Sequence, residues 1–248
     1  MRSIVVVPTY NERGTIPTLI DELLARPVDP DILVVDDNSP DGTAALVKAA
    51  GARHPGRIQL IERPGKEGLG RAYACGFETA VGQDTYDVVV QMDADGSHHP
   101  EDVDRLVQAA ADADLVIGSR YVPGGRVDGL TGPRELLSRG GNAYARAILR
   151  AGVNDLTGGF KAWRTDLLRT LLEDATVSDG YGFQIEMTMR AVRRGARIRE
   201  VPIVFHERRA GESKMNWRIA AEAARLVPRL ARNRELSGAP SGDVSRAS

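Results

Sequence analysis

Two aspartates separated by one residue form the feature of the sequence that most clearly suggests chemistry. Asp93 and Asp95 follow the apolar run YDVVVQM, and alternate residues of an extended chain point to the same side. Two carboxylates in one cleft repel each other unless a cation lies between them, and Mg²⁺ or Mn²⁺ joins such carboxylates to substrate phosphates. The pair therefore predicts a divalent cation site, with Ser97 as a further oxygen ligand, although a solvated turn has the same composition.

Two further acidic segments follow predicted strands. Asp36 and Asp37 end the run DILVVD, and Tyr10 and Glu12 follow the run SIVVVP. Because the carboxyl ends of parallel strands meet at one edge of a sheet, where α/β proteins bind ligands, we expect these side chains to lie near Asp93. A carboxylate there can accept hydrogen bonds from a base or a ribose, although each segment alone is also typical of an ordinary turn.

Several basic residues stand in glycine-containing loops or at predicted strand ends, where they can bind phosphates. Arginine binds phosphate through two N–H groups, and lysine acts as a point charge. The glycine-rich segment around Lys66 matches neither a Walker loop nor the GxGxxG fingerprint, which argues against an ATPase or a dehydrogenase. Ordinary surface charge accounts for most of the 33 basic residues. The candidates for phosphate contacts are Lys66, Arg120, Arg134, Arg139, Arg208 and Lys214, with Ser138 beside Arg139.

Alternating strand and helix patterns predict how these residues are positioned. Short runs rich in Val and Ile are typical of strands buried on both faces of a parallel sheet, and residues at helical spacing follow most of them. The predicted strands are 3–8, 31–36, 57–62, 86–92, 114–119, 158–163 and 196–205; the predicted helices are 16–24, 43–50, 68–81, 102–111, 136–150, 166–172, 183–194 and 216–233. This alternation predicts an α/β fold with a mostly parallel central sheet and flanking helices. We expect one domain over residues 1–234 and a disordered polar tail over residues 235–248.

Composition excludes several classes of protein. The 248 residues carry 33 basic and 34 acidic side chains, a balance too close to neutral for a protein that grips duplex nucleic acid. The single cysteine, Cys75, excludes an internal disulfide framework and a thiolate zinc site, and it fits a reducing compartment. No run approaches the roughly 20 apolar residues of a membrane-spanning helix. We therefore expect a soluble or peripheral protein, placed at the cytoplasmic face of a membrane.

The predicted C-terminal helix, within residues 216–234, has the composition of a helix that lies on a membrane surface. Its apolar residues Trp217 and Val227 share one helical stripe, and five arginines surround a single acid, Glu222. This pattern predicts an interfacial helix on anionic lipid. The alternative is a terminal helix that packs on the sheet, with its arginines in water.

The same segments carry a resemblance to a known family. They read PTYNE, VVDDNSPDGT, GKEGLGRAY, MDADGSHHP, GSRY, DLTGGF, GYGFQIEM and GESK, in this order. From Arg2 to Lys214 the chain resembles the dolichyl-phosphate mannosyltransferases, or polyprenol-monophosphomannose synthases, of the family-2 inverting glycosyltransferases. Other relatives carry transmembrane helices after the catalytic domain, whereas this chain resembles the short form.

The resemblance implies a GT-A fold, a GDP-mannose donor, a polyprenyl phosphate acceptor and a Mg²⁺ or Mn²⁺ cofactor. Asp93, Asp95, Arg120 and Lys214 would be catalytic, and Asp93, Asp95 and Ser97 would bind the metal, Ser97 standing where some relatives have Gln. Residues implied to bind the nucleotide sugar are Pro8, Tyr10, Glu12, Val35, Asp37, Lys66, Asp93, Ala94, Asp95, Arg120, Arg208 and Lys214. Residues implied to bind the acceptor phosphate are Arg120, Arg134, Ser138 and Arg139.

These residues are compatible with a single in-line displacement. The acceptor phosphate is ionised at neutral pH, so it needs no strong general base, and the metal with arginine and lysine neutralises the departing diphosphate. One displacement inverts the anomeric centre. Glucosyl transfer from UDP-glucose to the same lipid is an alternative, and a silent module that only binds nucleotide sugars is another.

Overall fold

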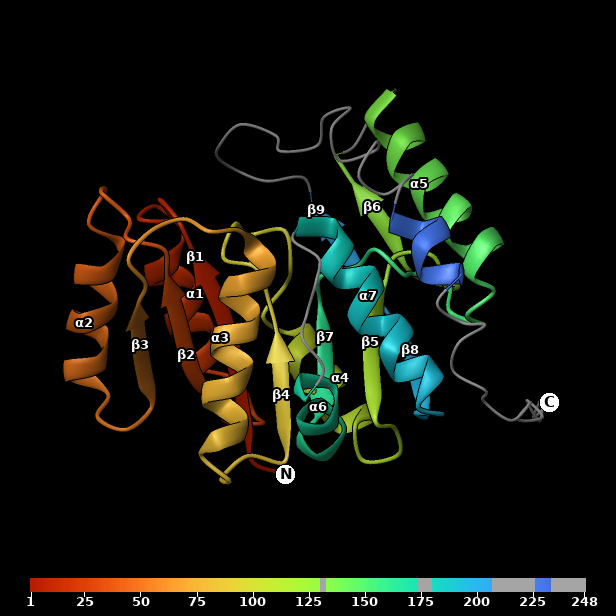
Figure 1. The fold of residues 1–248 in the computed structure, drawn as a ribbon. Helices are drawn as coiled ribbons and strands as arrows, with labels where there is room; N and C mark the ends of the chain where they lie inside the picture. The colour runs from red at the N-terminus through yellow and green to blue at the C-terminus, as the bar shows by residue number, and fades with distance from the viewer. Residues whose placement is uncertain (130–132, 174–179, 207–225, 233–248) are drawn as a thin grey trace.

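A twisted sheet of seven strands, in the order β3-β2-β1-β4-β7-β5-β8, forms the centre of the protein (Figure 1). The computed structural model describes residues 1–129, 133–173, 180–206 and 226–232. Strand β7 is antiparallel to both of its neighbours, and the other strand pairs are parallel. This confirms the predicted α/β fold. The strands are β1 (Ser3–Thr9), β2 (Asp31–Asp36), β3 (Ile58–Glu62), β4 (Val88–Gln91), β5 (Leu115–Ser119), β7 (Lys161–Arg164) and β8 (Ile198–Pro202).

Helices cover both faces of this sheet because its central strands are apolar on both sides. In β1, Ile4 and Val6 belong to one buried cluster, and Val5 and Val7 belong to the other. Helices α1 (Ile16–Leu24), α2 (Thr43–Arg53) and α4 (Asp102–Ala109) pack on the Val5 side. Helices α3 (Leu69–Gly82), α6 (Thr165–Leu172) and α7 (Gly180–Arg193) pack on the Ile4 side.

Helix α3 lies unusually close to the sheet at Gly76. A Cβ atom at this position would stand 2.4 Å from a methyl group of Val6 and 3.1 Å from one of Val35, so only glycine fits without displacing a core strand. The close approach also brings Tyr73, on the same helix, over the carboxyl end of β4.

Helix α5 (Pro133–Leu149) and the helical segment 226–232 lie side by side at the β8 end of the molecule (Figure 1). Ala145 and Leu149 of α5 and Val227 and Leu230 of the segment are buried in the same apolar cluster. The described part of the predicted C-terminal helix therefore uses its apolar side chains for packing within the protein. Its remaining residues, and the tail from 233 onward, lie outside the described residues.

One predicted strand, 196–205, is in fact two. Strand β8 ends at Pro202, and after Ile203 the chain enters β9 (Val204–His206), which pairs with β6 (Arg126–Asp128) in a separate two-stranded sheet. The Ile203 N–H donates to the Ser119 carbonyl, where the chain leaves the large sheet. The prediction was wrong because one apolar run spans both strands, and β6 is a short strand within a stretch that reads as a loop.

No helix within the described ranges is long and apolar enough to span a membrane.

Candidate active site

The two aspartates of the DAD segment lie just after β4, at the carboxyl edge of the parallel strands. Tyr73 Oη donates a hydrogen bond to Asp93 Oδ1 at 2.6 Å, and the Ser97 N–H donates to Asp95 Oδ1 at 3.1 Å. Asp95 is buried and Asp93 is half-buried. Within the described part of the chain, no lysine or arginine forms an ion pair with Asp93. Its negative charge is thus available for a cation.

The tyrosine beside this carboxylate is held in its protonated form. Burial raises the pKa of Tyr73 well above its ordinary value, and the charges of Asp93 and Asp95 raise it further. Both carboxylates therefore act on one buried hydroxyl. Phe183 stacks on the Tyr73 ring with centroids 6.0 Å apart, which fixes the hydroxyl against Asp93.

The oxygen atoms around the aspartates fit a hard divalent cation. The Oγ of Ser97 is buried and has no hydrogen-bond partner among the described residues, so a polar ligand there would satisfy it. Within those same residues, no group of three or more His, Cys, Asp and Glu side chains has metal-binding geometry. Two carboxylates and a hydroxyl are the kind of oxygen ligands that Mg²⁺ or Mn²⁺ takes from a protein, with further oxygens from substrate phosphates.

The neighbouring histidine supports the loop and adds no charge. His98 stacks on Phe160 with ring centroids 4.8 Å apart, and its Nδ1 accepts a hydrogen bond from the Asp93 N–H at 3.3 Å. Burial lowers the pKa of His98, although the two aspartates oppose this change. A neutral imidazole accepts the main-chain hydrogen bond that orients Asp93.

The predicted nucleotide-binding residues lie along the ends of β1 and β2. Pro8 and Val35 face each other across the two strands, and the Lys66 Nζ lies 4.0 Å from the centroid of the Tyr10 ring. The Val35 side chain is fully buried beneath α3, so only its main chain is available to a ligand. Ala94 is likewise buried.

Asp37 forms an ion pair that the sequence did not reveal. Arg63 Nη1 lies 2.6 Å from Asp37 Oδ1, both side chains are buried, and Arg63 Nη2 also contacts Glu67 at 2.7 Å. Burial raises the pKa of Asp37, and Arg63 opposes the change. The arginine therefore holds the carboxylate at the cleft edge in one orientation.

Glu12 and Asp36 stabilise the loops of this edge. The Glu12 N–H donates a hydrogen bond to the Thr43 hydroxyl oxygen at 3.1 Å, and the Thr15 hydroxyl donates to the Glu12 carboxylate at 3.2 Å. Asp36 accepts hydrogen bonds from the hydroxyls of Thr9 and Ser39 at 2.7 and 2.6 Å. Asp36 thus ties the two strand ends together.

Arg120 is held by a carboxylate instead of standing open for a phosphate. Its Nε and Nη2 atoms bind the two oxygens of Asp155 at 2.8 and 2.7 Å, and Nη2 also donates to the Thr157 hydroxyl. Although burial alone raises the pKa of Asp155, the charge and hydrogen bonds of Arg120 hold it below the ordinary value. The ion pair is buried and supports the loop that leads into β7.

Apart from Arg120, the predicted acceptor-phosphate residues lie on α5. The Ser138 hydroxyl is 3.2 Å from the Tyr121 hydroxyl, and Arg139 is exposed one residue further along the helix. The main chain of Arg134 is in the first turn of α5, and its side chain lies outside the described residues. Arg208 and Lys214 also lie outside them.

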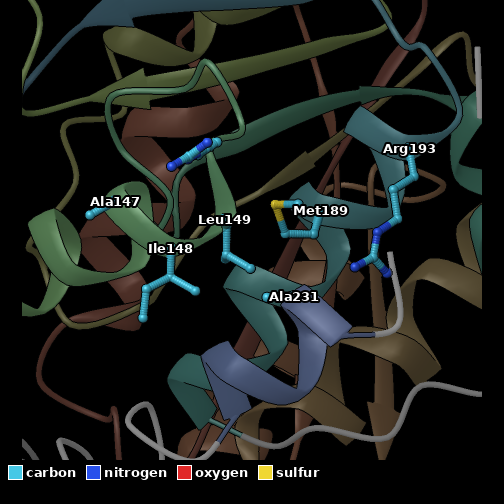
Figure 2. A pocket seen from close by; sticks show the side chains of 7 residues that line it. Ala147, Ile148, Leu149, Met189, Arg193 and Ala231 are labelled. Carbon is cyan, nitrogen blue, oxygen red and sulfur yellow. The ribbon is translucent and has the colours of Figure 1, made fainter. Parts of the chain in front are cut away.

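A cavity of about 560 Å³ lies away from the acidic cleft, between α5, α7 and the segment 226–232. Figure 2 shows Ile148 and Leu149 of α5, Met189 and Arg193 of α7, and Ala231 of the segment around it. Apolar side chains and two arginines, Arg150 and Arg193, line the cavity together.

The fold and the acidic edge agree with the comparison to known proteins. The model of the family described as glycosyl transferase family 2 matches residues 4–172. The chain belongs to glycosyl transferase family 2. This confirms the resemblance drawn from the motifs, and the chain is accordingly a glycosyltransferase.

Two curated relatives match nearly the whole chain. An undecaprenyl-phosphate mannosyltransferase of Micrococcus luteus is 46% identical over 229 residues, which cover 92% of this chain and 93% of the relative. A polyprenol monophosphomannose synthase of Mycolicibacterium smegmatis is 45% identical over 223 residues, which cover 90% of this chain and 84% of the relative.

Solved structures show that the fold is that of GT-A glycosyltransferases. A mannosyltransferase of Pyrobaculum calidifontis, in complex with GDP-mannose and Mn²⁺, matches with a TM-score of 0.62 and 23% identity over 96% of this chain and 66% of the other. A glucosyl-3-phosphoglycerate synthase of Mycobacterium tuberculosis with Mn²⁺ and UDP matches with a TM-score of 0.64 and 23% identity over 94% and 79% of the two chains.

Proposed function

We propose that the enzyme transfers mannose from GDP-mannose to a polyprenyl phosphate and inverts the anomeric centre. The observation that carries this proposal is the pair Asp93 and Asp95 at the carboxyl edge of the sheet, where Asp93 has a hydroxyl donor but no basic partner among the described residues. The two curated relatives, named for mannosyl transfer to undecaprenyl phosphate and for polyprenol monophosphomannose synthesis, support the choice of sugar and acceptor.

The residues at this edge suit a displacement assisted by a divalent cation. Mg²⁺ or Mn²⁺, when bound, neutralises charge on the leaving diphosphate as a Lewis acid. Asp93 and Asp95 would hold the ion, Tyr73 fixes the orientation of Asp93, and the Ser97 hydroxyl would offer a further oxygen. The Lys66 ammonium, held over the Tyr10 ring, adds positive charge on the nucleotide side. The carboxylate of Asp37, which Arg63 holds in place, accepts hydrogen bonds from the nucleoside in this scheme.

The acceptor phosphate attacks the anomeric carbon as the bond to the diphosphate breaks. A phosphate monoester is already ionised at neutral pH, so the reaction requires no general base. Ser138 and the arginines of α5 lie on the acceptor side. Arg208 and Lys214 complete the phosphate contacts; this role is assigned to them because of the family resemblance.

A lipid acceptor requires a surface that contacts a membrane, and we assign this role to the outer face of α5. Four large apolar side chains are exposed among the described residues, and two of them, Leu136 and Tyr144, are on this helix. From position 136 to position 150 the sequence contains no acidic residue, whereas Arg139, Arg146 and Arg150 are exposed. Exposed apolar groups among arginines suit an anionic membrane surface, and the cytoplasmic leaflet is rich in such lipids.

The C-terminal segment contributes charge to the same surface. Arg229 and Arg232 are exposed, while Val227 and Leu230 pack inward. The membrane contact is therefore shared between α5 and this segment, instead of resting on the C-terminal helix alone. The cavity in Figure 2 lies between these two elements and α7.

An assay with radiolabelled sugar nucleotides tests the proposal. The purified chain is incubated with polyprenyl phosphate, Mg²⁺ or Mn²⁺, and either GDP-mannose or UDP-glucose, and the lipid is extracted. We expect label in the lipid fraction from GDP-mannose only, and NMR of the product should show the β anomer formed from the α-linked donor. Transfer from UDP-glucose alone would establish the glucosyl alternative, and binding without transfer of either sugar would indicate a silent module.

A further inference from the structure

A line of hydrogen bonds with fixed direction runs through the core toward the acidic edge of the sheet. The Trp163 indole N–H donates to Gln91 Oε1 at 3.2 Å, and Gln91 Nε2 donates to Gln184 Oε1 at 2.7 Å. Lys161 Nζ donates to the same Gln184 Oε1 at 3.1 Å and to the Gln184 carbonyl at 3.0 Å. An indole N–H can only donate, so the Gln91 oxygen must face Trp163. The Gln91 NH₂ group then faces Gln184, whose oxygen must accept from it.

The orientation of the last amide is therefore determined by its surroundings. Gln91, Lys161 and Trp163 have no exposed surface, and Gln184 is 3% exposed. A reversed Gln184 amide would place its NH₂ group against the NH₂ of Gln91 and the amino group of Lys161. That arrangement would leave buried donors without acceptors, which is unfavourable because each such group has lost its hydrogen bonds to water.

The Gln184 NH₂ group consequently points away from Gln91 and Lys161 and lies near Gly159, beside Asp93. A Cβ atom placed on Gly159 would lie 3.6 Å from Gln184 Nε2 and 3.4 Å from Asp93 Oδ2, so both atoms border the same small space. No acceptor for Gln184 Nε2 exists among the described residues. The space is kept open because residue 159 has no side chain.

The antiparallel direction of β7 explains why these residues meet. A strand that runs against its neighbours begins at the edge where they end, so Gly159 and Lys161 come to the carboxyl edge of β4. Helix α7 starts at the same edge and brings Gln184 in its first turns.

We propose that Gln184 Nε2 donates a hydrogen bond to an oxygen of the sugar nucleotide held beside Asp93. This role deepens the proposed function and rests on it. The oxygen that accepts this hydrogen bond belongs to either the diphosphate or the transferred sugar. A neutral N–H donor next to a carboxylate contacts such an oxygen without competing for the cation.

Two substitutions test this role. Gln184→Glu keeps the shape and the acceptor for Lys161, but it replaces the donor with a carboxylate next to Asp93. Gly159→Ala fills the space with a methyl group at ordinary contact distances, and the φ of Gly159 is not positive. Gln108→Glu, on the exposed side of α4, and Gly82→Ala, which has no atom within 4 Å of its Cβ position, are the matched controls.

The measurement is the calorimetric Kd of GDP-mannose and of GDP, each with Mn²⁺, together with the Tm of every variant. We expect both test variants to bind GDP-mannose about tenfold more weakly, the effect of one lost hydrogen bond, while the controls bind as the wild type does and Gly159→Ala keeps its Tm. If Gln184 contacts the diphosphate, the Kd of GDP rises by the same factor as the Kd of GDP-mannose. If Gln184 contacts the sugar, the Kd of GDP stays at the wild-type value.

Wild-type affinity for both ligands in Gly159→Ala and Gln184→Glu would overturn the role of Gln184. If the wild type transfers mannose while the variants bind normally, only this inference fails. If the wild type does not bind GDP-mannose at all, the proposed function fails with it.

Discussion

The acidic edge of the sheet and the outer face of α5 are built in different ways. At the acidic edge, each carboxylate has assigned partners: Asp93 is held by Tyr73, Asp37 by Arg63, and Asp36 by two hydroxyls. On α5 the arginines are exposed along a helix whose sequence from 136 to 150 has no acid.

This difference indicates two kinds of recognition. Buried, hydrogen-bonded carboxylates bind one ligand in one geometry, and the loss of a single atom is costly. Exposed arginines attract a charged surface additively, and salt screens them. Substitutions in the two regions should therefore differ in size, in salt dependence and in which step they affect.

The largest effect is expected at the acidic edge. Asp93→Asn keeps the shape and the acceptor for Tyr73 but removes the charge that holds a cation, so mannosyl transfer should fall about a thousandfold. Initial rates with radiolabelled GDP-mannose measure this, and Asp21→Asn, on the exposed side of α1, is the matched control. Near-normal rates in a folded Asp93→Asn variant would contradict the site.

Arg120 separates support of the fold from phosphate binding. Arg120→Leu leaves the Asp155 carboxylate buried without its partner, which should lower the free energy of unfolding by about 3–5 kcal/mol. Urea denaturation measures this change. The double variant Arg120→Leu with Asp155→Leu should recover much of the stability. A stable single variant with weak lipid-phosphate binding would instead favour the phosphate role implied by the family resemblance.

On the α5 face, smaller and additive effects are expected. Arg146→Gln with Arg150→Gln should weaken binding to vesicles rich in anionic phospholipid about 30-fold, because each arginine contributes about 1 kcal/mol. Flotation at several salt concentrations measures this. The matched pair Arg53→Gln with Arg71→Gln removes the same amount of charge from exposed positions on α2 and α3. If both double variants lose the same amount of vesicle binding, α5 is not a specific membrane-binding face.

The most gradual effect, spread over several pH units, concerns the buried lysine. Burial lowers the pKa of Lys161 to about 7 from an ordinary 10.5. Between these two pH values the unfolded chain binds more protons than the folded one, so the free energy of unfolding should rise with pH, by at most about 1.4 kcal/mol per unit. Lys161→Met should lack this rise. If the free energy of unfolding depends on pH in the same way for both proteins over this range, Lys161 stays protonated in the folded protein.

Much of the N-terminal half could be predicted from local patterns. The bounds of α1 and β2 agree with the prediction, because Ile and Leu at helical spacing and continuous Val and Ile runs are unambiguous signals. The acidic edge followed from the rule that parallel strands end together.

The remaining features depend on contacts between distant parts of the sequence. Arg120 is itself one of the predicted phosphate-binding residues, but nothing local in the sequence shows that Asp155 binds it. Tyr73 reads as one more aromatic residue of a helix core until α3 is placed against β4. Lys161 ends a glycine-rich segment and reads as surface charge, because its burial depends on the antiparallel entry of β7 between β4 and β5.

Binding of Mn²⁺ in the presence of GDP tests the acidic site most directly. Electron paramagnetic resonance of the free ion gives the bound fraction for the wild type and for Asp93→Asn at equal protein concentration. We expect one Mn²⁺ per chain in the wild type and loss of that site in the variant. Equal binding by both proteins would show that the cation lies elsewhere and would contradict the role assigned to Asp93 and Asp95.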